Sequence, residues 1–486
     1  MNDLKRKTVK GILWSTLEQW SYHTLNTLAF VVFARLLGPE DFGTWGIAVI
    51  YIGFAAIPIN FGLREAVIQQ QNITQNQLAS VFSFQVLACL GVVVFTLLVA
   101  PSIAEILHIP QLSAVLQLCT IIIACDGLCF LQECLFQKEF NFRIGALRRF
   151  FGMLVGAFIG ISAALLGAGI WSLVLFHCCG SITRFIVIWT ATRWRPSLEF
   201  DWFAASPVYA YGRKVLVPNL MYRIKSQSDR ILIGALLGHS ALGYYTFALK
   251  ICTILHELVS ASLSQVVLPL FSRLQDDIPK ARRAYLRLLH AGCLVGVPAF
   301  LGALATAPLF IPLFFGEEWN AVIPLFQLLA LSGAIQTFLY RTPAILSALG
   351  HLHTQFKLAA INCVLAIPFL WIGASHSLIG AAIMFCLLTW ILWLITEAYL
   401  RKILGYSRKD YIQAVARPFL ASFFMLLFLM AGIRNLSLTP TWPVLLSSIT
   451  AGFILYALMI FAGNYHRMTG EIRNFRSQFS NPEIRP

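Results

Sequence analysis

Long apolar runs separated by short polar joints dominate the sequence. Each run approaches or exceeds the roughly 20 predominantly apolar residues that a helix needs to cross the hydrocarbon layer of a membrane. The pattern therefore predicts an all-α integral membrane protein with about 14 transmembrane helices. The predicted spans are residues 11–37, 43–68, 79–100, 112–136, 145–167, 170–191, 208–237, 241–270, 286–315, 320–348, 354–375, 377–399, 413–434 and 443–464.

The polar joints alternate between two kinds. Lys and Arg gather in one set, at 5–10, 138–149, 193–214, 273–287, 357, 401–409 and 467–485. The opposite set of joints contains a single Lys or Arg, Arg434. The joint at 69–77 is an exception to the alternation, because it is polar but uncharged. Because basic joints stay in the cytoplasm, we expect a bacterial inner-membrane protein with both termini on the cytoplasmic side.

Composition supports this interpretation. Hydrophobic residues make up 58% of the chain and charged residues only 12%, which excludes a soluble domain. The net charge of +15 comes from the basic joints, so we expect no nucleic-acid partner. The eleven cysteines form no CxxC pair and are interpreted as apolar packing residues, with no metal site. The N-terminus imitates a signal peptide, but its apolar stretch contains Glu18 and Asn26 and predicts a retained first helix.

An internal repeat links the two halves of the chain. The segment Arg35-Leu-Leu-Gly-Pro-Glu-Asp-Phe-Gly43 matches Ala235-Leu-Leu-Gly-His-Ser-Ala-Leu-Gly243 at an offset of 200 residues. The match joins the first pair of predicted spans to the seventh and eighth. Parallel repeats around a central axis are a known transporter architecture.

Charged residues inside the spans are the main candidates for function. Asn219, Arg223, Ser226 and Arg230 are spaced to share one face of the seventh predicted span. A face this polar must contact protein or water. The alternative is a salt-bridge network between helices, and Asp229 can pair locally with Lys225.

Other spans add to this set. Shifting by the repeat offset places Asn26 on an equivalent face of the first span, so both helices are predicted to flank one cavity. Lys250 and Glu257 share a face in the eighth span, and Arg341 lies in the tenth. The cavity is therefore predicted to be cationic. Basic residues near the span ends can instead extend to the interface: Arg35, Arg64, Arg184 and Arg417.

Acidic residues in the spans are candidates for ion coupling. Asp126 and Glu133 stand seven residues apart in the fourth span and share a face, and Glu18 and Glu257 lie in other spans. Intramembrane carboxylates mark proton or ion pathways. Pairing with the basic residues of the spans is the alternative for each of them. Coupling to protons or to sodium is left open, and no cofactor is expected.

A cationic cavity suits a substrate with an anionic head group, because an isolated charge is costly to move through a membrane. Four motifs stand out in the sequence: Phe33-Ala-Arg-Leu-Leu-Gly-Pro-Glu-Asp-Phe-Gly43, Phe61-Gly-Leu-Arg-Glu-Ala66, Asp229-Arg-Ile-Leu-Ile-Gly234 and Leu242-Gly-Tyr-Tyr245. Through these motifs the sequence resembles the polysaccharide-transport branch of the multidrug/oligosaccharidyl-lipid/polysaccharide exporter superfamily, the Wzx-type flippases, and most of all their colanic-acid and teichuronic-acid exporter group.

The resemblance implies two six-helix lobes, residues 1–200 and 201–405, followed by two further helices and a basic tail at 406–486. It implies alternating access that moves an undecaprenyl-diphosphate-linked oligosaccharide to the outer leaflet. Expected partners are this substrate, membrane lipids, a polysaccharide polymerase and chain-length machinery. The predicted cavity residues are Arg223, Arg230, Lys250, Arg341, Asn26 and Asn219, and the gating or ion-coupling candidates are Glu18, Asp126, Asp229, Glu257, Arg35 and Arg64.

Two rival functions are weighed against this one. A cation-coupled multidrug antiporter of the same superfamily should have an acidic and aromatic cavity, which the basic excess disfavours. A membrane glycan polymerase or ligase would need a sizeable outer loop with catalytic groups, whereas the outer joints are short. Since no catalytic constellation or nucleotide-binding motif is found, we expect a protein that is not an enzyme.

Overall fold

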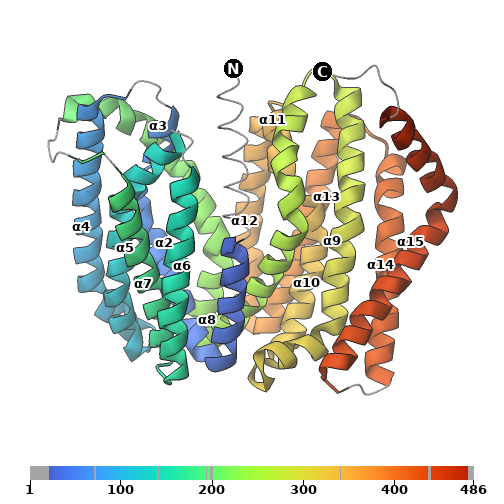
Figure 1. The fold of residues 1–486 in the computed structure, drawn as a ribbon, viewed down its shortest axis with the longest axis horizontal. Helices are drawn as coiled ribbons and strands as arrows, with labels where there is room; N and C mark the ends of the chain where they lie inside the picture. Colours follow the sequence, from blue (N-terminus) through green and yellow to red (C-terminus); the bar gives the residue numbers. More distant parts are fainter. Residues whose placement is uncertain are drawn as a thin grey trace. The chain divides into compact units, whose positions relative to one another are not determined.

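A computed structural model of the chain describes residues 21–69, 73–138, 142–192, 194–196, 201–339, 341–435 and 439–479. These residues form an all-α fold without strands (Figure 1). The helices are α2 (Pro39–Asn60), α3 (Leu63–Gln69), α4 (Gln75–Ile106), α5 (Pro110–Lys138), α6 (Phe142–Leu165), α7 (Ile170–Ala191), α8 (Trp202–Arg273), α9 (Ile278–Phe315), α10 (Val322–Leu339), α11 (Thr342–Ala348), α12 (Leu352–His376), α13 (Leu378–Leu404), α14 (Arg408–Asn435) and α15 (Trp442–Phe479).

The helices follow the predicted spans closely. In the described part of the chain, 12 helical segments are long and apolar enough to cross a membrane. The first predicted span begins in residues outside the description and continues as a helix over 21–36. The all-α membrane fold is therefore confirmed, while the count of 14 spans remains approximate.

Gly238 explains why one long helix corresponds to two predicted spans. The seventh and eighth predicted spans both lie in α8, which is interrupted at this residue. Gly238 has φ 86° and ψ 177°, a conformation that residues with a Cβ rarely adopt. The joint predicted from the sequence between 237 and 241 is thus a break in the helical backbone rather than an extended loop.

Local sequence signals fix several helix starts. The hydroxyl of Thr74 accepts a hydrogen bond from the N–H of Gln77, whose side chain accepts one from the N–H of Thr74, forming a capping box at the start of α4. Asp277 caps α9 by accepting from the N–H of Lys280. Hydrogen bonds from Lys280 hold the pKa of Asp277 below its ordinary value.

Residues 1–247 and 366–381 form the first of two compact units, called unit 1. Within it α6 packs along α7, and α5 contacts α2, α4 and α7. Gly156 allows the close approach of α6 and α7, because a Cβ there would collide with the carbonyl oxygen of Phe176. An apolar core, which includes Leu63, Val81 and Leu131, joins α3, α4 and α5.

Residues 248–365 and 382–486 form unit 2. In this unit α9 contacts α10, α14 and α15. The hydroxyl of Tyr456 on α15 donates to the carbonyl oxygen of Leu294 on α9 at 2.7 Å. Trp393 on α13 donates to the hydroxyl of Tyr411 on α14 at 2.9 Å. The predicted lobe boundaries at 200 and 405 stay a prediction.

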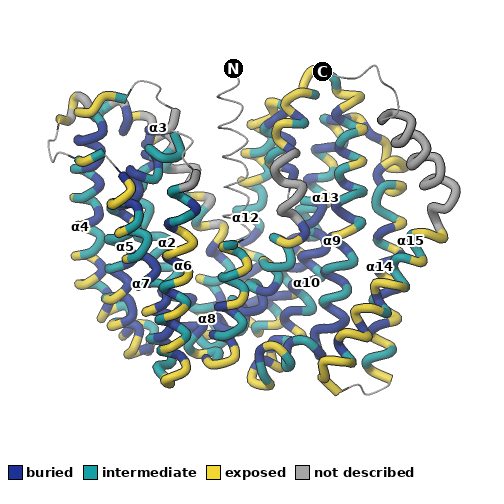
Figure 2. Tube along the Cα trace, in the orientation of Figure 1, coloured by how far each residue is buried: buried dark blue, intermediate teal, exposed yellow. Residues whose placement is uncertain are grey.

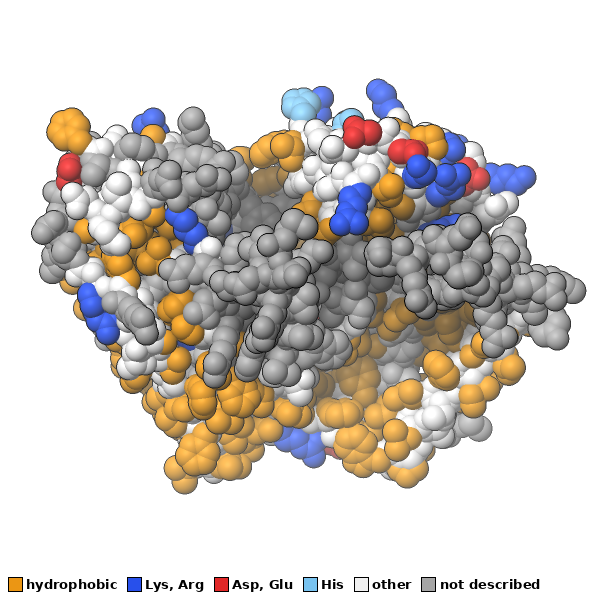
Figure 3. Space-filling model, turned by 45° about the horizontal axis from the view of Figure 1, so that its top comes forward, with side chains coloured by type: hydrophobic (Ala, Val, Ile, Leu, Met, Phe, Trp, Pro, Cys, Tyr) orange, Lys and Arg blue, Asp and Glu red, His pale blue; other side chains and the backbone are white. Residues whose placement is uncertain are grey.

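Buried and exposed positions alternate along the helices of each unit (Figure 2). Many exposed side chains are large and apolar, such as Leu98 at 72% and Phe158 at 75% exposure. The face shown in Figure 3 has broad hydrophobic areas, with charged side chains present only in scattered places between them and near the top of the view. A surface of this composition is suited to lipid chains rather than to water.

Candidate functional site

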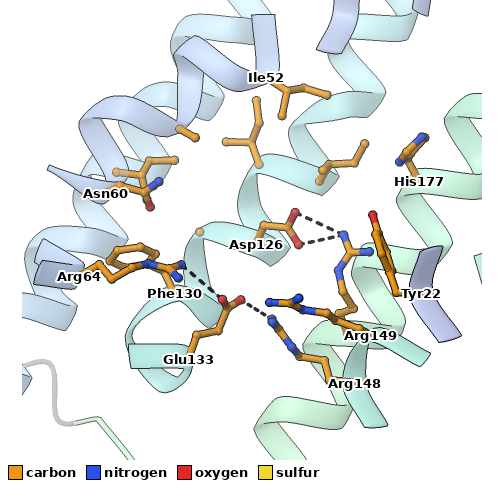
Figure 4. A pocket seen from close by; sticks show the side chains of 16 residues that line it. Tyr22, Ile52, Asn60, Arg64, Asp126, Phe130, Glu133, Arg148, Arg149 and His177 are labelled. Carbon is orange, nitrogen blue, oxygen red and sulfur yellow. Dashed lines mark hydrogen bonds and ion pairs between the residues drawn. The ribbon is translucent and has the colours of Figure 1, made fainter. Parts of the chain in front are cut away.

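A charged pocket lies inside unit 1 (Figure 4). Its volume is about 480 Å³, and its lining comes from the helix over 21–36 and from α2, α3, α5, α6 and α7. Ligand pockets of proteins are usually of this size. The ionised residues of the lining are Arg64, Asp126, Glu133, Arg148, Arg149 and Arg184.

A tight turn brings Arg64 to the pocket. α2 ends at Asn60; the next residue, Phe61, has φ 36°, and Gly62 follows with φ 69°. A Cβ on Gly62 would also collide with the backbone of Gly212 on α8, so glycine is required here for two reasons. The turn places the guanidinium of Arg64 over the ring of Phe130, 5.2 Å from its centroid. A cation–π contact of this kind is worth about 0.5–1 kcal/mol at an exposed site.

Glu133 on α5 holds two of the arginines. Its Oε2 lies 3.5 Å from Nη2 of Arg64, and its Oε1 accepts a hydrogen bond from Nη1 of Arg148 on α6. The side chains of Arg148 and Glu133 are only 8% and 17% exposed. Removing either partner would leave a charge in an environment that solvates it poorly. Figure 4 shows Glu133 between the two guanidinium groups.

Asp126 forms a further ion pair in the pocket. Seven residues before Glu133, it lies on the same side of α5. Nη2 of Arg184 on α7 lies 3.2 Å and 3.3 Å from its two carboxylate oxygens and also donates to the hydroxyl of Ser181. Gly152 on α6 makes room for this arginine, since a Cβ there would lie 2.6 Å from Cγ of Arg184. Asp126 is about half exposed, at 48%.

Aromatic and neutral polar groups complete the lining. The ring of His177 stacks on Trp45, with centroids 4.5 Å apart and an angle of 18°. Tyr22, Asn26 and His177 line a smaller adjoining cavity of about 50 Å³. These side chains can exchange hydrogen bonds with hydroxyl or amide groups of a ligand. Neutral polar groups thus lie beside the charged ones.

The charges of the described lining do not cancel. Four guanidinium groups face two carboxylates, which leaves an excess of two positive charges. Arg149 on α6 points toward the centre of the pocket (Figure 4). In a medium of low dielectric constant, this excess favours an anionic ligand. Among the described residues no cluster suited to a metal ion is found.

The structure places four of the predicted residues in or beside this pocket. Arg64, Asp126 and Glu133 line it, and Asn26 lines the smaller adjoining cavity. Arg184, interpreted from the sequence as reaching the membrane interface, instead pairs with Asp126. Arg148 and Arg149 had been assigned to a cytoplasmic joint but lie in the second turn of α6. The sequence signal that could have pointed to these arginines was the acidic pair Asp126 and Glu133 on the preceding span, which needs basic partners.

The predicted residues on α8 lie elsewhere in unit 1. The guanidinium of Arg223 lies beside Gly53 of α2, where a Cβ would be 3.4 Å from its Cζ. Arg230 donates to the amide oxygen of Gln227, one turn earlier in α8, at 3.2 Å. Asp229 accepts a hydrogen bond of 3.0 Å from the hydroxyl of Tyr245. Their predicted roles in a cavity stay a prediction.

The remaining predicted residues are divided between several places. Arg341 is buried in unit 2, where its Nη1 donates to the carbonyl oxygen of Thr337. Lys250 and Glu257 also belong to unit 2 and are partly buried, and Arg35 is exposed at the end of the helix over 21–36. Glu18 and the side chain of Asn219 lie outside the described residues.

Comparison with solved structures identifies the fold. The lipid II flippase MurJ, in an inward closed conformation, has a TM-score of 0.75 and 15% identity over 93% of this chain and 99% of that chain. An inward-facing multidrug resistance MATE transporter has a TM-score of 0.60 and 15% identity over 79% of this chain and 94% of that one. This chain is therefore a multi-pass membrane protein with the fold that these transporters share.

The family follows from the sequence comparison. Residues 32–324 match the family described as polysaccharide biosynthesis protein, and the chain belongs to it. This membership confirms the resemblance that the motifs indicated. The lipopolysaccharide biosynthesis protein WzxC of Escherichia coli (strain K12) is 25% identical over 86% of both chains. The succinoglycan biosynthesis transport protein ExoT of Rhizobium meliloti (strain 1021) is 26% identical over 86% of this chain and 83% of its own.

Proposed function

We propose that the protein is a flippase for a lipid-linked oligosaccharide in exopolysaccharide or lipopolysaccharide biosynthesis. It moves an undecaprenyl-diphosphate-linked repeat unit from the cytoplasmic to the outer leaflet of the inner membrane by alternating access. The observation that carries this proposal is the pocket of unit 1, whose described lining has four guanidinium groups and two carboxylates. A diphosphate that joins a lipid to a sugar carries two negative charges, which such arginines can bind.

Arginine is the side chain best suited to hold such a head group. Its planar guanidinium donates hydrogen bonds in pairs to phosphate oxygens and keeps its charge at all physiological pH values. Arg149 and Arg184 approach the pocket from neighbouring helices, so one diphosphate can bind to both. Tyr22 and His177 lie beside them and can bind sugar hydroxyl groups.

The membrane potential supports transport in the outward direction. Moving one negative charge out of a negative cytoplasm releases about 2.3 kcal/mol per 100 mV. Two charges therefore contribute about 4.6 kcal/mol at 100 mV. Export can proceed on this basis without a nucleotide, and coupling to protons or sodium through Asp126 or Glu133 would add to the driving force.

The relatives support the same substrate class. Those compared above have names that refer to lipopolysaccharide and succinoglycan biosynthesis, and the solved structure with the same fold is described as a lipid II flippase. We place the protein in the inner membrane with both termini in the cytoplasm, on the strength of the basic joints. We further propose that it performs no chemical step and hands its substrate to a polysaccharide polymerase and chain-length machinery.

Reconstitution tests the proposal. Purified protein in liposomes should accelerate the movement of a fluorescent undecaprenyl-diphosphate oligosaccharide between leaflets, measured by its accessibility to an enzyme added outside. The rate should rise when an imposed potential favours movement of anions, and runs with pH or sodium gradients identify any coupling ion. Protein-free liposomes serve as the control. Unchanged glycan movement together with transport of a cationic dye would instead support the multidrug antiporter.

A further inference from the structure

Two carboxylates line the pocket, although a site that binds phosphate does not need acidic side chains. Asp126 and Glu133 both face the arginines from α5, and each is engaged by guanidinium groups of other helices. Carboxylates repel phosphate and compete with it for the same donors. Their presence beside the predicted head-group site therefore needs a physical reason.

The reason lies in the number of charges. Without these acids the described lining would carry four positive charges, whereas with them it carries two. A transport site must bind its substrate firmly enough to capture it and weakly enough to release it. A complex without net charge also has the lowest cost of transfer through a medium of low dielectric constant. By lowering the positive charge of the described lining, the two acids weaken its attraction for any negative charge beyond those of a diphosphate.

We propose that Asp126 and Glu133 set the charge selectivity of the pocket, so that it accepts a lipid diphosphate whose adjoining sugar is uncharged. This inference rests on the proposed function and names the substrate class more closely. A head group with an acidic sugar next to the diphosphate would bring a third negative charge. The two acids would repel this third charge.

The two acids are not equivalent in this role. Glu133 is 17% exposed and holds Arg64 and Arg148 from two other helices, so its loss would also displace these arginines. Asp126 is 48% exposed and pairs with Arg184 alone among the described ion pairs. Asp126 is therefore the position at which charge can be changed with the least effect on the lining.

Binding of two matched ligands tests the inference. The full-length protein in nanodiscs is titrated with a polyprenyl-diphosphate glucose, which has two negative charges, and with the corresponding glucuronic acid derivative, which has three. The wild type should prefer the glucose lipid. Asp126→Asn should shift the ratio of the two dissociation constants toward the glucuronic acid lipid by roughly tenfold, because one counter-charge is lost near the ligand.

A charge-restoring variant separates selectivity from structure. Asp126→Asn combined with Arg184→Gln restores the net charge of the described lining to that of the wild type, and it should return the ratio toward the wild-type value even if both affinities fall. Glu105→Gln, which removes an acid outside the pocket, should leave the ratio unchanged. The ratio also stays interpretable if the single variant is less stable, because both ligands are measured on the same folded fraction.

The outcomes are distinct. An unchanged ratio in Asp126→Asn, or a shift that persists in the double variant, would overturn the inference while leaving the proposed function intact. If the wild type binds neither lipid, the proposed function itself fails. A shift in the single variant that the double variant reverses supports the assignment of Asp126 as a residue that determines specificity.

Discussion

Gly43 and Gly243 meet backbone to backbone within unit 1. A Cβ on Gly43 would collide with the carbonyl oxygen of His239 and lie 3.3 Å from the nitrogen of Gly243. A Cβ on Gly243 would collide with the carbonyl oxygen of Pro39 and lie 3.0 Å from the nitrogen of Gly43. Since each residue corresponds to its partner at the repeat offset of 200, the contact is reciprocal, like the self-complementary contact of a two-fold dimer.

Alanine at either glycine should therefore weaken the fold. Gly43→Ala and Gly243→Ala each force backbone apart, and overpacking of this kind costs about 1–3 kcal/mol. Thermal unfolding in detergent should show a lower midpoint for each variant. Gly91→Ala in α4 is the control, because no atom lies within 4 Å of its Cβ and alanine favours the helix. Equal midpoints for all three variants would contradict the steric role of the contact.

Glu133 should be more important for stability than an exposed acid. Glu133→Gln leaves the buried guanidinium of Arg148 without its counter-charge, at a cost on the order of 3 kcal/mol. Denaturant unfolding followed by tryptophan fluorescence measures this change. Lys280→Gln removes an ion pair with Asp277 at the surface and should leave stability almost unchanged. A Glu133 variant as stable as the Lys280 variant would show that the buried network contributes little.

Arg184 should be required for binding a diphosphate head group. Arg184→Gln removes hydrogen bonds from a charged donor, each worth about 1.5–3 kcal/mol, so affinity for a polyprenyl-diphosphate sugar should fall about tenfold to hundredfold. Arg184→Lys should restore only part of it, because an ammonium group does not donate in a planar fork.

Isothermal titration with the purified protein measures these affinities. Arg273→Gln, at the exposed end of α8, is the matched loss of one positive charge away from the pocket. If Arg273→Gln weakens binding as much as Arg184→Gln does, the loss of affinity would come from the overall charge of the protein and not from the pocket.

Arg223 and Arg230 give a separate prediction about α8. Both lie outside the described pocket, yet the face that they share is too polar to meet lipid. Replacing both by Ala should abolish translocation while the protein still inserts into the membrane. Polymer export by a strain that lacks the chromosomal gene, with protein levels checked by immunoblot, tests this. Export at the full rate would exclude a role of these arginines in transport.

The pattern of apolar runs predicted most of the helices because each span is encoded locally. A stretch of apolar residues must form a helix in lipid, where every backbone group needs a partner within the segment. The break at Gly238 was visible in the same way, as a short polar joint between two runs. The internal repeat at an offset of 200 residues was also visible in the sequence, because two matching segments are enough to detect it.

Charge pairing was predicted less well. Asp126 and Glu133 were recognised as one face of a helix, and pairing with basic residues of the spans was the stated alternative, but the particular partners were not predicted. Arg148 stands 15 residues and Arg184 58 residues along the chain from the acids that they contact. No local pattern encodes these distances, because they depend on how α5, α6 and α7 pack.

The sequence by itself thus determined the all-α membrane architecture, the family, and a repeat that contains Gly43 and Gly243. Only the tertiary structure decided that these two glycines touch, and that Arg148 and Arg149 belong to a pocket rather than to a cytoplasmic joint. The physical reason is the range of the interactions involved. Hydrophobicity and helix propensity act within one segment, whereas the pocket arises where side chains of several helices converge.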